Sequence, residues 1–427
     1  MAAQGATVVV RRGRIFAMNA GPLWRGGDPD PLVAPVEAGA VAIVEGRIAY
    51  VGADADLPRD LRRLRTLDAG GRAVLPGLVD CHTHLPFAAW RADEYAVRLQ
   101  GASYADQQRR HGLSGIARSA AELAASAEPD VLAFCQRRLR EAARAGTTTL
   151  EMKSGYGGDG EGELRSLGLM ATLRGRTAVR LVRTALLLHA RPADGDRRAW
   201  VEAAVSDILP RAVAAGLVDG VDAFVETIAY SLEEAAPLIR AGQAAGLATH
   251  LHAEQLAPSG AALWAASHGV TSVDHLDHLD PAGVRALCAG ATVAVLLPGA
   301  TFLSGGPRLP PVGDLLAGGA AVALATDLNP GTSPVASLPE CVAIACRAWG
   351  MPLSAALAGV TVNAAAALGR AAEVGALRPG MAGDAVILDG DEPALLAYRL
   401  GHAAVWGVVS GGRVLVWGGE EDEPKAS

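Results

Sequence analysis

The sequence predicts an α/β protein whose main body is a (β/α)8 TIM barrel, joined to a small composite β-sandwich domain built from both termini. Two observations carry this prediction. The middle of the chain alternates eight short apolar runs with helical stretches rich in Ala, Leu and Arg, as a barrel of parallel strands requires. Both ends instead carry short β-branched runs between glycine turns. An open doubly wound sheet is the alternative, but no GxGxxG turn follows the first strand.

The two ends of the chain are expected to form one domain together. Strands are predicted at 7–10, 40–44, 384–388 and in a hairpin over 408–416. The turns between them use Gly and Asp, as at 45–48 and 68–71. We therefore predict that residues 1–72 and 372–427 make the sandwich, and that residues 73–371 form the inserted barrel.

The barrel strands are identified by short apolar runs of strand length. They are predicted at 73–79, 147–152, 179–183, 220–225, 248–252, 271–274, 292–296 and 321–325. Helical stretches such as 130–145 and 232–245 lie between them. In a barrel of this kind the chemistry lies at the carboxyl ends of the strands, so the residues that follow each run are the candidate site.

Composition narrows the class of protein. Of 427 residues, 50% are hydrophobic, enough for a large core, and the net charge of −7 argues against a nucleic-acid partner. Five scattered cysteines without a CxxC pair argue against a disulfide framework and for a reducing cytoplasm. Neither a signal peptide nor an apolar run of membrane length is present, so we expect a cytoplasmic protein without a membrane partner.

Two histidines follow the first predicted barrel strand. His82 and His84 are two residues apart, and on extended backbone such side chains share a face. Imidazoles that converge at a strand end suit a divalent transition metal. A structural pair of hydrogen-bonded histidines fits the same spacing. The residues at the other strand ends are needed to distinguish this alternative from metal binding.

The other strand ends supply the remaining ligands. His250 and His252 come from the fifth strand, and Asp327 follows the eighth. Together with the first pair, one of these two histidines and the aspartate make three imidazoles and a carboxylate. That set leaves a coordination position open for water, as a hydrolytic site needs. The spacing cannot choose between the two histidines, because they share a face.

Several stretches resemble a known family. The run 76–84, Pro-Gly-Leu-Val-Asp-Cys-His-Thr-His, is similar to the first metal motif of the amidohydrolase superfamily, and Asp327 matches its second hallmark. More narrowly, the chain resembles the imidazolonepropionase family over nearly its whole length. The stretches specific to that family are Lys-Ser-Gly-Tyr-Gly at 153–157, His-Ala-Glu-Gln at 252–255 and Asn-Pro-Gly-Thr-Ser-Pro at 329–334.

This resemblance implies hydrolytic opening of a five-membered imidazolone ring in histidine degradation. It implies one divalent metal ion, Zn2+ or Fe, and a homodimer. The implied metal ligands are His82, His84, His252 and Asp327. The implied contacts to a small substrate with a carboxylate side chain are Arg91, Tyr104, Tyr156, His189, Gln255, Asn329, Gly331 and Thr332. The implied catalytic residues are Asp327, His275 and Gln255.

The chemistry of these residue types agrees with the implied roles. Asp327 can accept a proton from water and return it to the leaving nitrogen. His275 can stabilise the developing oxyanion, and Arg91 offers a planar fork for a carboxylate. Lys153 stands where binuclear relatives carry a carbamylated lysine that bridges two metals. In the family that the chain resembles this lysine is not a bridge, so we expect one metal.

Several positions depart from the family pattern, among them the run 111–115, and four of them are candidates for a changed specificity: Trp90, Leu187, Leu188 and Leu328. Two alternatives therefore accompany the ordinary ring-opening activity. One is a paralogue that hydrolyses a related ring, such as a thio-substituted or S-methylthio imidazolone or a hydantoin propionate. The other is a deaminase of the same superfamily. A non-catalytic scaffold is disfavoured, since such proteins tend to lose metal ligands and this chain keeps all four.

Overall fold

The computed structural model describes residues 5–101, 115–190, 196–305, 308–402, 404–418 and 420–421. Within them, eight parallel strands follow one another around a barrel in chain order. These strands are β6 (Leu78–Asp80), β7 (Thr147–Lys153), β8 (Arg180–Leu188), β9 (Gly220–Val225), β10 (Ala248–Ala253), β11 (Ser272–His275), β12 (Val293–Leu296) and β13 (Val322–Leu324). The predicted (β/α)8 barrel is confirmed.

The barrel closes where its first and last strands end. Thr83, just after β6, forms a parallel bridge with Leu328, just after β13. The backbone N–H of His84 donates to the carbonyl of Leu328 over 2.9 Å, and that of Asp327 donates to His82 over 3.0 Å. This closure brings the first and eighth strand ends, which are far apart in the sequence, into hydrogen-bond contact.

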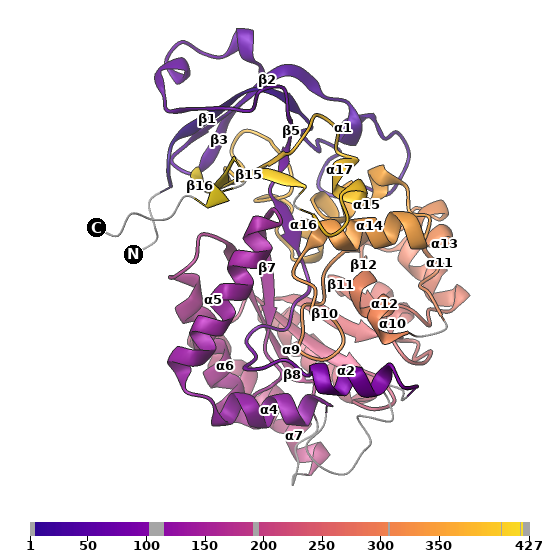
Figure 1. Ribbon diagram of the computed structural model, residues 1–427. Coiled ribbons are helices and arrows are strands. Elements are labelled where there is room, and N and C mark those ends of the chain that lie inside the picture. The colour runs from indigo at the N-terminus through magenta and orange to yellow at the C-terminus, as the bar shows by residue number, and fades with distance from the viewer. Residues whose placement is uncertain are drawn as a thin grey trace.

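The second sheet contains strands from both ends of the chain (Figure 1). Its order is β17-β16-β15-β14-β5-β1-β2-β3, with β4 paired to β1. The bounds are β1 (Val8–Ile15), β2 (Val36–Val44), β3 (Arg47–Ala53), β4 (Thr66–Asp68), β5 (Ala73–Pro76), β14 (Ala385–Leu388), β15 (Val405–Ser410), β16 (Arg413–Trp417) and β17 (Glu420–Glu421). The predicted terminal strands and the hairpin at Gly411 and Gly412 are confirmed.

The expectation of a single strand over 73–79 is wrong. The run divides at Gly77 into β5, which pairs with β1 and β14 in the terminal sheet, and β6, which pairs with β7 in the barrel. A Cβ at Gly77 would collide with the side chain of Thr148, so a larger residue does not fit at this crossing. An apolar run shows that a segment is buried, but it does not show which sheet buries it.

The longer helices lie on the outside of the barrel (Figure 1). They include α4 (Gly115–Ala125), α5 (Glu128–Arg144), α6 (Gly160–Arg174), α9 (Leu232–Ala244), α11 (Pro281–Ala289) and α14 (Leu338–Ala348). Helices α5 and α9 match the predicted stretches to within two residues. Helix α9 begins with a capping box, in which Ser231 and Glu234 satisfy each other's backbone N–H groups. None of the described helices combines the length and apolarity needed to cross a membrane.

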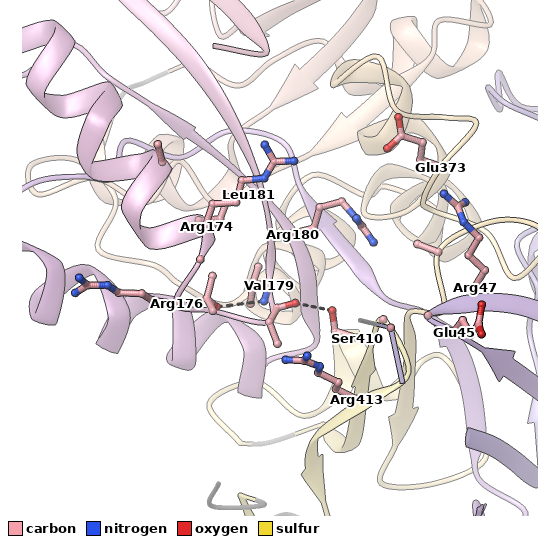
Figure 2. Close-up of a pocket in the computed structure, with 18 residues that line it drawn as sticks. Glu45, Arg47, Arg174, Arg176, Val179, Arg180, Leu181, Glu373, Ser410 and Arg413 are labelled. Atoms are coloured by element: carbon pink, nitrogen blue, oxygen red, sulfur yellow. Dashed lines mark hydrogen bonds between the residues drawn. The ribbon is translucent and has the colours of Figure 1, made fainter. Parts of the chain in front are cut away.

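A cavity of about 1040 Å³ lies where the barrel meets the terminal sheet (Figure 2). Its charged lining residues are Glu45, Arg47, Arg174, Arg176, Arg180, Glu373 and Arg413. The labelled arginine side chains extend in different directions in Figure 2, and Arg176 points away from the others. Ser410 donates to the carbonyl of Ala178 over 2.8 Å, which ties β15 to the barrel. Because its cationic groups do not converge, we interpret the cavity as a solvated domain junction.

Candidate metal and substrate site

The four side chains predicted to bind the metal, His82, His84, His252 and Asp327, lie together at the carboxyl end of the barrel. The Nε2 atom of His84 is 3.2 Å from Nε2 of His82 and 3.2 Å from Nε2 of His252. The Oδ1 atom of Asp327 is 3.2 Å from His84 Nε2 and 3.6 Å from His82 Nε2. All four side chains are buried. Three imidazole nitrogens and one carboxylate oxygen therefore meet at one point, from β10 and from the segments that follow β6 and β13.

Two aspartates, Asp222 in β9 and Asp274 in β11, lie against two of these histidines. His82 Nδ1 lies 2.7 Å from Asp274 Oδ2, and His252 Nδ1 lies 3.0 Å from Asp222 Oδ2. A neutral imidazole carries one N–H, and each carboxylate draws that N–H to Nδ1. Burial lowers the pKa of His82 well below its usual value, so its ring stays neutral. The Nε2 lone pairs of both rings are then directed toward His84.

Such a donor set fits a divalent cation. Lone pairs that face one another at 3.2 Å repel unless a proton or a cation lies between them. The Oδ1 atom of Asp327 is buried without a hydrogen-bond donor in the described part of the chain. Burial raises the pKa of this carboxyl group to about 7, so the protein by itself does not compensate its negative charge. A bound cation would compensate both the lone pairs and the carboxylate.

His250 is placed differently from His252. Its Nδ1 atom is 2.9 Å from Ser272 Oγ, and its Nε2 atom is 3.7 Å from Glu151 Oε1. Burial, followed by the nearby Lys153, lowers its pKa to about 3. His250 therefore belongs to a polar layer deeper in the barrel, and the geometry brings His252 to the other candidate ligands.

Lys153 also lies in this deeper layer, with no exposed surface. Its Nζ atom is 2.9 Å from Glu151 Oε2 and 2.8 Å from Asp222 Oδ2. Burial opposes the charge of this ammonium group, but Asp222, Glu151 and Asp274 outweigh that effect and raise its pKa. A protonated amine does not form a carbamate, so the arrangement supports the expectation that Lys153 does not bridge two metals.

A narrow cavity lies directly over the candidate ligands. It is lined by His84, Arg91, Ile116, Tyr156, His189, Phe224, His252, Gln255, His275, Asp327, Asn329 and Thr332. Six of the predicted substrate contacts are in this lining. Gly331 lies beside it, and its backbone packs against the guanidinium group of Arg91. Tyr104 falls outside the described residues.

Arg91 is the buried cation of this cavity. Its side chain is 2% exposed, and its Nη1 atom is 3.7 Å from Glu94 Oε2. Neither Nε nor Nη1 has a hydrogen-bond acceptor among the described residues. Buried N–H groups without acceptors are costly, and a guanidinium fork matches a carboxylate. The side chain is therefore prepared for an anionic group of a ligand.

Tyr156 is held by the loop that follows β7. The N–H groups of Gly155 and Gly157 donate to the two carboxylate oxygens of Glu163, over 2.9 Å and 2.6 Å. The carbonyl of Gly155 in turn lies 3.0 Å from Nδ1 of His189. Glu163 is itself buried in the first turn of α6. One carboxylate thus fixes the backbone on both sides of the tyrosine.

Asn329 organises the loop after β13. Its Oδ1 atom accepts the N–H groups of Gly331 and Thr332, over 2.8 Å and 2.7 Å, and its Nδ2 group donates to the carbonyl of Asp327 over 2.7 Å. Asp327 has a φ of 52° and His275 a φ of 80°. Such positive values are uncommon for residues other than glycine and are often found where side chains are held for function.

The four candidates for altered specificity do not line this cavity. Trp90 packs with its ring 5.0 Å from that of Phe87 and 5.8 Å from that of Phe134, and it lines a neighbouring cavity together with Arg91 and Gly331. Leu187, Leu188 and Leu328 are buried in the hydrophobic core. These departures from the family pattern therefore change the packing around the site.

Sequence reasoning missed four residues that belong to the site. Ile116 and Phe224 provide apolar walls of the cavity, and Phe224 lies 5.6 Å from the ring of His252. Asp222 and Asp274 orient the histidine ligands. The two aspartates carried a usable signal, because each is a charged residue inside an otherwise apolar strand run. Ile116 and Phe224 carried none, since apolar residues are expected throughout the barrel.

Comparison with known proteins identifies relatives over most of the chain. The amidohydrolase family model matches residues 73–415. Imidazolonepropionase from Cupriavidus pinatubonensis is 43% identical over 389 residues, which cover 91% of this chain and 91% of the relative. Imidazolonepropionase from Agrobacterium fabrum is 42% identical over 401 residues, which cover 91% of this chain and 95% of the relative.

Solved structures share the fold at much lower identity. An adenosine deaminase from Xanthomonas campestris with bound zinc aligns with a TM-score of 0.71 at 16% identity, covering 98% of this chain and 95% of that chain. Guanine deaminase from E. coli aligns with a TM-score of 0.71 at 15% identity, covering 97% of this chain and all of that chain. At these identities the likeness describes the fold alone.

Proposed function

The chain belongs to the amidohydrolase family and, within it, to the imidazolonepropionases, and from this premise we propose that it opens the ring of 4-imidazolone-5-propanoate by hydrolysis. The product would be N-formimidoyl-L-glutamate, in the breakdown of histidine. One observation supports the proposal for these residues: the converging Nε2 atoms and Asp327 lie in one cavity with the buried guanidinium group of Arg91, whose Nε and Nη1 atoms have no acceptor among the described residues.

His82, His84, His252 and Asp327 would hold one divalent ion, zinc or iron. When bound, such an ion supplies Lewis-acid activation, which makes water a nucleophile near neutral pH. Three buried imidazoles and a carboxylate agree with either metal. Elemental analysis of the purified protein tests this assignment, and we expect it to find one metal ion per chain.

Arg91 would bind the propionate group of the substrate. The fork of its guanidinium group offers parallel N–H donors to both carboxylate oxygens. Tyr156, His189, Asn329 and Thr332 line the same cavity and would contact the rest of the molecule. With the propionate on Arg91, the ring would lie over the metal-ligand candidates, where its bond would be cleaved.

Proton transfer would be carried out by the side chains around the ring. Asp327 would accept the proton of the attacking water and return it to the ring nitrogen as the C–N bond breaks. His275 would donate a hydrogen bond to the carbonyl oxygen as that oxygen gains negative charge. Its Nδ1 atom has no partner within the described residues, so the ring is available for this contact. Gln255 would contact the ring from the loop after β10.

The two alternative activities are not favoured. Relatives at 41–43% identity over about nine tenths of the chain carry the imidazolonepropionase name. The residues that suggested a changed ring specificity lie outside the cavity lining. The deaminases that share the fold do so at only 15–16% identity.

The decisive experiment is a spectroscopic assay with fresh imidazolonepropionate. We expect the imidazolone absorbance to disappear as formimidoylglutamate forms, without release of ammonia. Turnover of a thio-substituted analogue alone would instead support the paralogue, and ammonia release without ring opening would support the deaminase. Arg91→Met should raise KM far more than it lowers kcat, because it removes the partner of the propionate.

We further propose that the enzyme works in the cytoplasm as a homodimer, without nucleic-acid or membrane partners. Its five cysteines are all free, and its net charge of −7 disfavours binding to nucleic acid. Sedimentation equilibrium tests the dimer directly.

A further inference from the structure

The ammonium group of Lys153 lies among three carboxylates inside the barrel. Its Nζ atom is 2.8 Å from Asp222 Oδ2, 2.9 Å from Glu151 Oε2 and 3.6 Å from Asp274 Oδ2. All four side chains are completely buried. Burying one cation among three acidic groups is expensive unless their geometry is tightly held. The cluster therefore calls for an explanation beyond packing.

Two of these carboxylates also hold metal-ligand candidates, and they do so with the oxygen atoms that face Lys153. Asp222 Oδ2 is shared between Lys153 and His252 Nδ1, which is 3.0 Å away. Asp274 Oδ2 is shared between Lys153 and His82 Nδ1, which is 2.7 Å away. Lys153 thus connects the aspartates that lie against two histidines, one just after β6 and one in β10.

The residue type fits this position closely. Lys153 is one of only two lysines among the 38 basic residues of the chain, which uses arginine almost everywhere else. An ammonium group is compact and carries three donors, whereas a guanidinium group is larger and planar. Three carboxylates around one point match the ammonium group and would leave a guanidinium group too little room.

We propose that Lys153 is a positioning residue that fixes Asp222 and Asp274 against His252 and His82, and thereby sets the affinity of the site for its metal. The proposal rests on the metal site described under the proposed function. Lys153 touches neither substrate nor ligand atoms in this role. It acts because the two carboxyl groups keep their direction toward the histidines only while the ammonium group stands between them.

The test compares zinc affinity, measured by chelator competition, in the intact protein and in Lys153→Met. We expect the variant to bind zinc about 10- to 100-fold more weakly, the usual effect of disturbing the groups behind metal ligands. Arg183→Met is the matched control: Arg183 is a buried cation of β8 paired with Asp219 over 3.1 Å, away from the candidate ligands. It should leave zinc affinity unchanged. Equal affinity in Lys153→Met and the wild type would overturn the proposal.

A second variant keeps the test informative if Lys153→Met does not fold. Lys153→Met combined with Glu151→Gln removes one positive and one negative charge, so the buried net charge is restored. Among the described residues, Glu151 pairs with none of the four proposed ligands, so its change leaves Asp222 and Asp274 unsupported. We expect this double variant to fold and still to bind zinc about 10-fold or more weakly. Wild-type zinc affinity in the folded double variant would contradict a positioning role.

The readout also separates this proposal from the proposed reaction. If the wild type binds zinc but does not hydrolyse imidazolonepropionate, a weakened Lys153→Met still supports the positioning role. If the wild type hydrolyses imidazolonepropionate and Lys153→Met loses activity with unchanged zinc affinity, the reaction stands and the positioning role fails.

Discussion

The guanidinium group of Arg91 lies against the backbone of Gly331, in space that a Cβ at position 331 would fill. This contact joins the turn before α2 (Ala92–Arg98) to the loop after β13. It explains why the loop needs glycine at this point although its backbone does not require a positive φ. The absence of a side chain makes room for the cation of the cavity.

Gly331→Ala should displace Arg91 and weaken substrate binding. We expect KM to rise about 10-fold, equivalent to about 1.4 kcal/mol of lost binding, with a smaller change in kcat. Gly168→Ala is the matched control, since a Cβ on Gly168 in α6 meets open space. Steady-state kinetics of both variants measure the effect, and equal KM values would show that Arg91 does not bind the substrate.

Glu163→Gln should loosen the loop that carries Tyr156. The amide keeps one acceptor but directs its NH2 group at a backbone N–H, which leaves a buried donor unpaired at a cost of about 1–3 kcal/mol. We expect a higher KM and a lower Tm. Glu161→Gln, on the same helix but with a side chain 76% exposed, should change neither. An unchanged KM in a destabilised Glu163→Gln would limit the role of this residue to folding.

Substitutions of the two histidines of β10, His250 and His252, should have different effects on the metal content of the protein. His252→Asn removes a ligand candidate and should reduce the bound metal of the purified protein to a small fraction. His250→Asn changes a side chain two residues away that contacts Ser272, so the metal content should remain near that of the wild type. Elemental analysis decides the matter, and the reverse result would reassign the ligand.

His250 should also contribute to acid sensitivity. Its pKa is about 3 in the folded protein, below the value of about 6.5 for an unfolded histidine. A histidine with a depressed folded pKa stabilises the protein fully above pH 6.5, and this contribution is lost as the pH falls toward 3, because only the unfolded chain takes up the proton. The loss amounts to about 1.4 kcal/mol per pH unit in that window.

The measurement that tests this effect is the free energy of unfolding in urea, determined for the wild type and for His250→Asn at pH 7 and at pH 5. The wild type should lose about 2 kcal/mol more than the variant between these conditions, because the unfolded chain takes up its proton mainly below pH 6.5. Parallel losses would mean that His250 is protonated in the folded state.

The sequence predicted the barrel because eight apolar runs of strand length cannot be buried in many other ways. The course of the chain at Gly77 could not be predicted, because both sheets bury their strands equally well. The side-chain direction of Trp90 could not be predicted for a similar reason. A residue next to Arg91 in the sequence can point to the other side of the backbone, and only the packing against Phe87 and Phe134 determines its direction.

The candidate site was predictable where function demands an unusual residue type. His82, His84 and Asp327 stand out at strand ends because charged and ligating groups are rare in such positions. The deeper layer was not predictable, since the distance between Lys153 and Asp222 depends on how two strands face each other across the barrel. The hydrogen bonds from Gly155 and Gly157 to Glu163 could not be predicted either, because an acidic residue in the first turn of a helix is common.

The enclosure of Lys153 makes this chain a natural reporter of its own opening. Reagents that acylate primary amines modify exposed lysine side chains readily. They reach Lys153 only when the strands around it separate, because its side chain has no exposed surface. The rate at which mass spectrometry detects acylated Lys153 would therefore measure the opening of the barrel under native conditions, with no introduced label.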